Sequence, residues 1–449
     1  MSVTSKSELS GWGRYPRRQT TVLCPQDISE AVPPAVGQMI ARGQGRSYGD
    51  AAMSMNGIVM LTERLSRFVS FDEQTGLLTA QAGTTLAEVI REFLPRGWFP
   101  AVVPGTREVS LGGCVAADIH GKNHHRDGAF GTQVKGIEIV LADRSRLRCS
   151  AATEAQVFRA TLGGMGLTGL ITEVALQLAP VESSYLVVQH HQTRDLDESF
   201  AKLADKAWDD HYTVAWVDCL ARGRKLGRGV LMRGHHARVD ELPAKLRDRP
   251  FAKPRRHYRL GFDFPSWALN AAGIRAFNEC YFRWQGRRRQ PFIADYESFF
   301  FPLDLVGNWN RAYGKRGFVQ YQCVLPTAEA RPGMQALLEA LAGSGQSSYL
   351  SVLKRFGPAG QGLLSFPVEG YTLTLDLPVG DPGLFPFLDR LDAIVLEHGG
   401  RVYLAKDARL NPRTFRAMYP RFEEWLAVKR LVDPDNRFAS DLARRLEII

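Results

Sequence analysis

The chain has 449 residues, enough to bury a large core and to form two or three domains. Its hydrophobic content of 45% and charged content of 23% are those of a globular protein, and no segment has the roughly 18 consecutive apolar residues of a membrane span. The N-terminus lacks the apolar core of a secretory signal peptide, so we expect a cytoplasmic location. The six cysteines are scattered without Cys-x-x-Cys spacing, so we expect no metal site and no disulfide framework.

The net charge of +10 is concentrated in one stretch. Between Arg222 and Arg289 there are 18 Lys and Arg against 5 Asp and Glu, a local excess of +13 that leaves −3 for the rest of the chain. Such a patch indicates a polyanionic partner: anionic lipid, a phosphorylated substrate or nucleic acid. The plain alternative is a solvated basic face. No RNP, helix-turn-helix or OB signature accompanies the patch, so we expect no nucleic-acid partner.

The first 180 residues read as an α+β unit. Helical periodicity predicts helices over Thr85–Leu94 and Thr153–Leu162, and Thr85 with Glu88 has the spacing of a capping box. Strands are predicted over Thr20–Cys24, Gly37–Ala41, Phe68–Phe71, Leu77–Gly83, Gly136–Ala142, Arg146–Cys149 and Leu170–Leu178.

From about Val181 strand patterns dominate, separated by polar segments. The predicted strands are Tyr185–His190, Val214–Cys219, Val230–Arg233, Phe318–Leu325, Tyr349–Lys354 and Tyr371–Leu377, and the predicted helices are Leu196–Trp208, Ala272–Trp284, Met334–Leu341 and Leu384–His398. This order suggests an antiparallel sheet with helices on one face. Past Gly399-Gly400 we expect a short strand over Arg401–Ala405, one helix capped by Asn411 that runs through the 410s and 420s, and a last amphipathic helix after Phe438.

Glycine-rich loops carry the chemistry of the first unit. The loop Arg42–Asp50 has glycines at 43, 45 and 49, which let backbone N–H groups converge on a phosphate. It lacks the spacing of a Rossmann motif and the lysine of a Walker motif, and a simple turn is the alternative. The stretch Pro104–His125 combines glycines with His120, Lys122 and two further histidines, and we interpret it as the wall of a cofactor site.

Taken together, these motifs resemble the vanillyl-alcohol-oxidase type of FAD-dependent oxidoreductase. The motifs are the loop at 43–50, Pro-Gly-Thr at 104–106, Gly-Gly at 112–113, the glycine cluster at 163–169, and Asp433-Pro with Arg437-Phe438. The resemblance implies an α+β, two-domain FAD-binding fold with an inserted antiparallel-sheet substrate domain. We expect the FAD domain at 1–180 and 401–449, and the substrate domain at 181–400.

A narrower resemblance covers about 11–449. The segments GWGR (11–14), GRSYGD (45–50), DIHGKNHH (118–125), GNWNRAYG (307–314), QYQ (320–322), FGP (356–358), YLAKDAR (403–409) and FASDLARRLEI (438–448) are similar to the decaprenylphosphoryl-β-D-ribose oxidase family. This implies oxidation of the ribose 2′-hydroxyl of a polyprenyl-phosphate sugar to a ketone, the first half of an epimerisation that yields the arabinose donor of cell-wall glycans. An NAD-dependent keto-reductase is the implied partner.

The resemblance also implies the cofactor residues. Arg46 stands where related enzymes can carry a covalently linked histidine, so we expect non-covalent FAD. The expected FAD contacts are Ala41, Arg42, Gly43, Gln44, Gly45, Arg46, Ser47, Tyr48, Gly49, Asp50, Ala51, Gly105, Ser110, Leu111, Gly112, Gly113, Ala117, Asp118, Ile119, His120, Ile171 and Tyr403.

Alcohol oxidation needs a hydride acceptor, a route for the hydroxyl proton and a cation near the flavin's pyrimidine edge. By the resemblance, Lys406 is the candidate for that cation and for contact with the hydroxyl, and His120 is the candidate for the proton path. The expected substrate contacts are Lys122, Trp216, Arg311, Tyr313, Gln320, Gln322, Lys354, Thr374 and Lys406. His124 and His125 are expected to be structural.

The chain departs from the family pattern at three pocket positions. Thr374 replaces a cysteine, Thr372 an asparagine, and Phe300 an aromatic residue with a hydroxyl. These changes put the exact sugar and lipid in question and remove the thiol that a cysteine-directed inhibitor needs.

A polyprenyl-phosphate substrate lives in a membrane, so the basic stretch with Trp267, Tyr281, Phe282 and Trp284 is expected to meet an anionic membrane surface peripherally. Two alternatives stay open. One is a soluble aldonolactone or alditol oxidase of the same superfamily, and the other is a non-catalytic flavoprotein that uses its basic patch.

Overall fold

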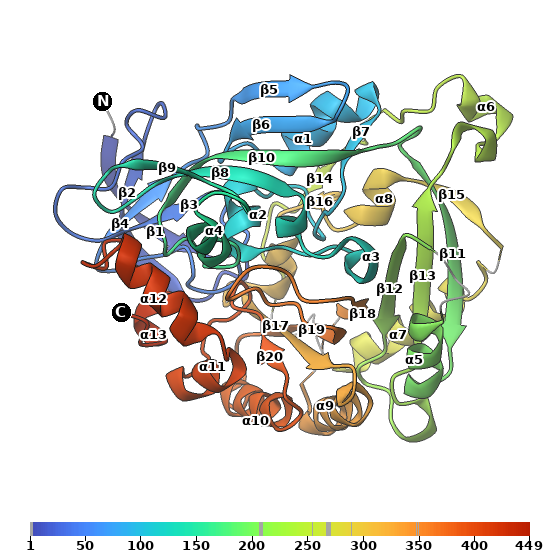
Figure 1. Ribbon diagram of the computed structural model, residues 1–449. Helices are drawn as coiled ribbons and strands as arrows, with labels where there is room; N and C mark the ends of the chain where they lie inside the picture. Colours follow the sequence, from blue (N-terminus) through green and yellow to red (C-terminus); the bar gives the residue numbers. More distant parts are fainter. Residues whose placement is uncertain are drawn as a thin grey trace.

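The computed structural model describes residues 3–205, 210–253, 255–265, 271–288, 290–346, 348 and 350–449. Two small sheets from the N-terminal part lie beside one large sheet from the middle of the chain, and the C-terminal helices pack against the N-terminal part (Figure 1). No helix in these ranges is both long and apolar enough to cross a bilayer.

The first sheet has four strands in the order β1-β2-β4-β3. They are β1 (Val3–Ser10), β2 (Arg17–Cys24), β4 (Ile58–Leu61) and β3 (Met39–Arg42). β3 pairs parallel to β4 and ends directly at the glycine-rich loop. The loop therefore starts from the end of a strand that is paired within a sheet.

The second sheet surrounds a long central strand, β10 (Leu170–Pro180). Its other strands are β5 (Phe68–Asp72), β6 (Leu77–Gln81), β7 (Trp98–Pro100), β8 (Val134–Val140) and β9 (Arg146–Cys149). The helices of this part are α1 (Leu86–Phe93), α2 (Leu111–Ala117), α3 (His124–Asp127) and α4 (Ala155–Thr161). The capping box predicted at Thr85 and Glu88 begins α1, as expected.

The third sheet has eight strands and every pairing in it is antiparallel. In spatial order its strands are β15 (Phe292–Asp295), β11 (Tyr185–Thr193), β13 (Gly229–His236), β12 (Tyr212–Val217), β18 (Ser351–Phe356), β19 (Gly370–Pro378), β17 (Phe318–Pro326) and β20 (Arg401–Val402). The antiparallel sheet expected in the middle of the chain is present.

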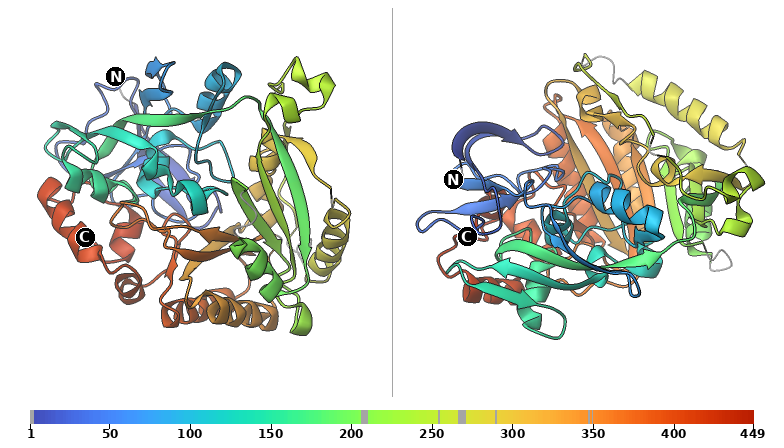
Figure 2. Two further views of the ribbon diagram at one scale, coloured as in Figure 1. Left: turned by 45° about the vertical axis from the view of Figure 1, so that its right-hand side comes forward. Right: turned by 90° about the horizontal axis from the view of Figure 1, so that it is seen from above.

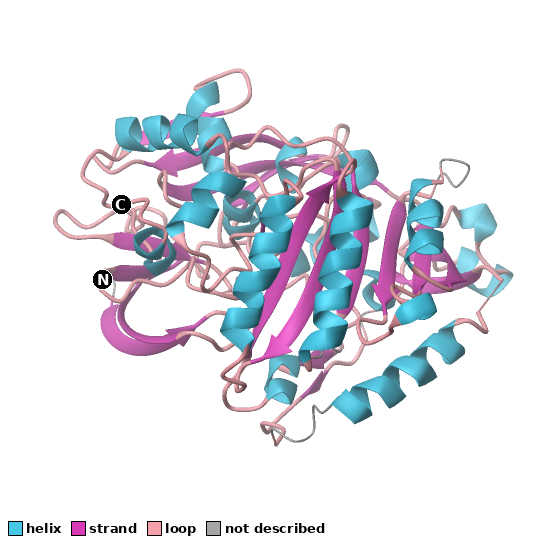
Figure 3. Cartoon of the chain, turned by 90° about the horizontal axis from the view of Figure 1, so that it is seen from below, coloured by secondary structure: helices cyan, strands magenta, loops and turns pink. Residues whose placement is uncertain are grey.

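Helices lie on both faces of this sheet, whereas we expected them on one face. α5 (Leu196–Ala204), α9 (Ala330–Ser344) and α10 (Leu384–Glu397) lie on one side, and Figure 3 shows helices packed over the strands. α7 (Ala271–Gln285) lies on the opposite face, where Tyr281 packs on Trp216 of β12. That face also carries α8 (Tyr296–Phe300) and a small parallel pair, β14 (Tyr258–Arg259) with β16 (Val306–Gly307).

The C-terminal segment returns to the first sheet (Figure 2). It forms α11 (Pro412–Met418), α12 (Phe422–Val432) and α13 (Asp441–Arg445), and Phe438 bridges to Met39 of β3. A buried ion pair between Lys429 and Asp433 fixes the turn before Phe438. Because β20 joins the third sheet, the division of the chain at 180 and 400 stays a prediction.

Candidate active site

One large cavity of about 1170 Å³ lies between the N-terminal part and the face of the third sheet that carries α7 and α8. Pockets for drug-sized ligands usually have about 300–1,000 Å³, so this space suits a large cofactor together with a second molecule.

Two loops of the N-terminal part form one wall of the cavity and touch each other. At Gly43 a Cβ atom would lie 2.0 Å from Ser110 Oγ, and Gly45 has φ +61°, which only glycine adopts without strain. Such backbone-rich loops can present N–H groups to a pyrophosphate, so this wall fits a dinucleotide. The expected FAD contacts that line the cavity are Ala41, Gly43, Gln44, Gly45, Arg46, Ser47, Tyr48, Ala51, Gly105, Ser110, Gly112, Gly113, Ala117, Ile119, His120, Ile171 and Tyr403.

The other five expected contacts lie behind this wall and hold it in place. Arg42 donates to Ser10 O at 2.6 Å, and Asp50 accepts two hydrogen bonds from Arg445. Asp118 is fully buried and accepts from the Gly131 N–H at 2.7 Å. Gly49 touches the backbone at Asp407, and Leu111 is fully buried in the core.

Lys406 lies in the turn after β20 and points into the cavity, with its Nζ 3.9 Å from the centre of the Tyr48 ring. Burial lowers its pKa to about 7, against the opposing effect of the carboxylate of Asp376. Asp376 accepts hydrogen bonds from Gln320 at 2.5 Å and from the Tyr313 hydroxyl at 3.3 Å, and burial raises its pKa to about 7. A cation and a carboxyl group that both titrate near neutral pH thus lie in one cavity, an arrangement typical of active sites.

His120 is buried among Phe356, Phe366 and Tyr403, and the Gln322 amide nitrogen lies 2.8 Å from its Nε2. Burial and the nearby Lys354 hold its pKa well below the usual value, so the ring is neutral. The amide makes Nε2 the acceptor, which leaves the proton on Nδ1. This Nδ1 is buried and has no hydrogen-bond partner within the described ranges.

Two further lysines make the cavity cationic. Lys122 donates to Phe299 O and lies over the Phe299 ring at 4.3 Å, and burial together with Lys354 lowers its pKa to about 7. Burial lowers the pKa of Lys354 to about 8. Because burying lysines is costly, such a cluster gains free energy when an anion binds.

Eight of the nine expected substrate contacts line the cavity. Arg311 does not, because its guanidinium donates to Gly261 O at 2.6 Å and faces Asp263. His124 packs against the Phe356 ring at a tilt and accepts from the Gly357 N–H, and His125 contacts Asp210 O, both structural contacts. The eight contacts in the wall are Lys122, Trp216, Tyr313, Gln320, Gln322, Lys354, Thr374 and Lys406.

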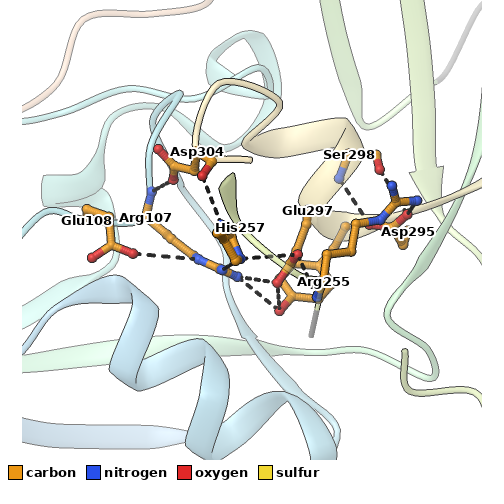
Figure 4. Close-up of polar contacts among 9 residues, drawn as sticks. Arg107, Glu108, Arg255, His257, Asp295, Glu297, Ser298 and Asp304 are labelled. Atoms are coloured by element: carbon orange, nitrogen blue, oxygen red, sulfur yellow. Dashed lines mark hydrogen bonds and ion pairs between the residues drawn. The ribbon is translucent and has the colours of Figure 1, made fainter. Parts of the chain in front are cut away.

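A polar network at the mouth of the cavity ties the N-terminal loop to the inserted segment (Figure 4). The Arg107 guanidinium donates to Glu297 at 2.6 Å and contacts His257 at 2.9 Å, and the Arg107 backbone N–H donates to Asp304. The backbone N–H of Arg255 also donates to Glu297. Arg107 thus joins α8 and the segment before β14 across the mouth.

Several wall residues were missed by the sequence reasoning. The most important is Asp376, which lies in a predicted hydrophobic strand and was not singled out. It follows Thr374 by two residues, so the strand period places both side chains on the same face of the sheet. The others include Trp12, whose ring lies under the Arg46 guanidinium at 4.1 Å, and the acidic residues Glu108 and Asp304.

Comparison with known proteins agrees with this geometry. Residues 25–150 match the model of an FAD binding domain, and residues 377–446 match that of D-arabinono-1,4-lactone oxidase. The chain is 40% identical to decaprenylphosphoryl-beta-D-ribose oxidase of Mycolicibacterium smegmatis, over 99% of this chain and 98% of that protein. The chain belongs to the decaprenylphosphoryl-β-D-ribose oxidase family.

As a member of this family, the protein is an FAD-dependent oxidoreductase. A protein of Streptomyces coelicolor is 37% identical over 80% of this chain and 98% of its own length. L-gulonolactone oxidase of Bos taurus is more distant, at 23% identity over 88% of this chain and 86% of its own length. The family resemblance and the FAD cofactor expected from the sequence are confirmed.

Proposed function

We propose that the protein oxidises the 2′-hydroxyl of a polyprenylphosphoryl-β-D-ribose to the 2′-keto sugar. The observation that carries this proposal is the near full-length similarity to a decaprenylphosphoryl-beta-D-ribose oxidase. The cationic cavity with amide and carboxyl side chains on its floor suits a sugar that carries a phosphate. The keto product can be reduced at the same carbon to the arabinose donor by an NAD-dependent keto-reductase, the partner we propose for the second half of the epimerisation.

FAD, when bound, supplies the hydride acceptor. The hydroxyl also loses a proton, and the Asp376 carboxylate, whose pKa burial raises to about 7, can accept it. Lys406 offers its positive charge to the negative charge that develops on the hydroxyl oxygen. The neutral His120 lines the cavity beside the sugar, and Gln322 fixes the orientation of its imidazole ring. Gln320 and Gln322 present amides for the ribose hydroxyls, and Lys122 and Lys354 face the phosphate.

We further propose that FAD is held without a covalent bond. Arg46 stands at the expected attachment position, and its guanidinium stacks on Trp12. Acid precipitation of the purified protein should release all of the flavin into the supernatant, whereas a flavin that stays with the pellet would contradict this proposal.

The function is tested by anaerobic mixing of the flavin-loaded protein with polyprenylphosphoryl ribose. We expect loss of the flavin absorbance, with one equivalent of 2′-keto sugar formed. Persistence of the oxidised spectrum at saturating substrate would refute the proposal. A protein that binds no FAD would refute the cofactor assignment as well.

The second candidate function is oxidation of a free aldonolactone or alditol with oxygen. It is favoured by the match of residues 377–446 to a lactone oxidase model and by the lactone oxidase relatives. Bleaching by free L-gulonolactone or a polyol, followed by rapid reoxidation in air, would support it over the leading proposal.

We propose that the mouth of the cavity contacts an anionic membrane peripherally. Tyr258 is 76% exposed, Phe262 65% and Trp284 53%, all within the basic stretch 222–289. Trp267, also expected at this surface, lies outside the described residues, and Tyr281 turns inward onto Trp216. Flotation with vesicles at low salt should show binding that requires anionic lipid, and equal binding to neutral vesicles would count against the contact.

A further inference from the structure

The cavity floor changes from polar to apolar across the third sheet. Side chains on alternate positions of six strands face the cavity, and their backbone pairing makes them neighbours. Starting at β17 and moving outward, the floor consists of Gln320 and Gln322 of β17, Thr374 and Asp376 of β19, Lys354 and Val352 of β18, Trp216 and Val214 of β12, Met232 of β13, and Val188 and His190 of β11.

The pairing fixes this order without a gap. Thr374 pairs with Val352, and Val352 pairs with Trp216. On the next step Val214 pairs with Met232, and Met232 pairs with His190. Directly paired residues share a face, so these side chains form one continuous surface.

The floor is long. Five strand spacings separate β19, in its polar part, from β15, which is about 24 Å at about 4.8 Å per spacing. Three of these spacings, about 14 Å, separate β12 from β15 and belong to the apolar part. Phe292 and Ala294 of β15 line its outer end. A pentose at the polar end leaves most of this length for another part of the substrate.

Helix α7 roofs the apolar part. Phe277, Tyr281 and Gln285 recur every four residues, so they share one helix face, and the Tyr281 ring lies 4.8 Å from that of Trp216. α7 is tied to the sheet by Gln192, which donates to Phe282 O, and by Arg228, which pairs with Glu279. Figure 2 shows this long helix at the outer edge of the molecule.

The polar groups of this part do not make it a second sugar site. His190 is buried and neutral at pH 7, since burial lowers its pKa to about 4. The Arg288 guanidinium lies over the rings of Trp284 and Phe292, at the outer end. Lys354 stands on β18, between the strands of Thr374 and Trp216, where the apolar part begins. Lys122 lies within electrostatic range of both Lys354 and His190.

We propose that the apolar part of the cavity, between α7 and strands β11, β12 and β13, binds the first isoprene units of the substrate lipid. Lys354 at its inner end then lies beside the phosphate that joins sugar and lipid, with Lys122 near it, and the chain leaves past Phe277, which is 45% exposed. This inference rests on the proposed function and adds the place and direction of the lipid to it.

The test compares ribosyl phosphates that carry one, three and ten isoprene units, with kcat/KM for anaerobic flavin reduction as the readout. For the natural chain we expect kcat/KM to rise about tenfold or more between the shortest and longest substrates, because apolar burial strengthens binding. Met232→Trp fills the apolar part and should remove this gain. Met232→Leu, which keeps the volume, is the matched control and should behave like the natural chain.

Flavin content and thermal unfolding establish that each variant is folded. The comparison of the three chain lengths in the natural protein tests the inference even if a variant does not fold. Equal kcat/KM for all three chain lengths would overturn the inference while leaving the proposed function intact. An undiminished length dependence in Met232→Trp would overturn it too. Failure of every substrate to reduce the flavin would instead refute the proposed function, and this inference with it.

Discussion

Replacement of Lys406 by methionine removes the charge on which the proposed chemistry depends and keeps most of the side-chain volume. A unit charge about 4 Å from a developing negative charge contributes about 4 kcal/mol at an effective dielectric constant of 20. The 3.9 Å approach of Nζ to the Tyr48 ring holds this ammonium inside the cavity rather than in solvent. We therefore expect Lys406→Met to lower kcat by about a thousandfold.

The assay is anaerobic stopped-flow reduction of the flavin by polyprenylphosphoryl ribose. Lys135→Met, on the exposed side of β8, is the matched control and should reduce its flavin at the natural rate. Lys406→Met should still bind FAD, since the glycine loops are untouched. Flavin reduction within a few-fold of the natural rate would remove Lys406 from the mechanism.

Three further predictions concern the surroundings of the site. Asp376→Asn removes a carboxylate that raises the pKa of Lys406. Turnover needs the charged lysine, so the rate falls as the pH rises through the lysine pKa of about 7. The variant should lower this pKa and move the midpoint of the pH–rate profile to lower pH. Thr374→Cys should add one thiol that iodoacetamide labels in the apoprotein and that FAD with substrate protects, as seen by peptide mass spectrometry. Arg107→Met leaves the 1%-exposed Glu297 without its cation, so urea denaturation should show a loss of about 3–5 kcal/mol that a second change, Glu297→Gln, partly restores.

Much of the fold followed from local pattern. The alternating strands β8 and β10 and the amphipathic α1 have strong periodicity, and their predicted and observed ranges agree within a few residues. Strand β1 (VTSKSELS) was not predicted, because as an edge strand it pairs only with β2 and lacks an apolar alternation. β15 is also an edge strand, and all four of its residues are half-buried, so it too lacks an alternation of apolar and polar residues.

The site residues that lie in sequence motifs could be predicted, whereas those placed by packing between distant segments could not. The motif residues Lys406, His120 and Gln322 come together in one cavity, although more than 80 residues separate each from the next. Arg311 lies in a matching segment but turns away, because Asp263 and Gly261 O, outside any motif, draw its guanidinium. The apolar floor and its roof could not be read from sequence, since they depend on the order of strands that pair across the sheet.

The position of oxidation tests the central claim most directly. Polyprenylphosphoryl ribose with deuterium at C2 of the ribose should reduce the flavin several-fold more slowly than the unlabelled sugar, and its product should have lost that deuterium. Deuterium at C3 should have no comparable effect. Retention of the C2 label in the product, or a rate effect only at another carbon, would contradict the account.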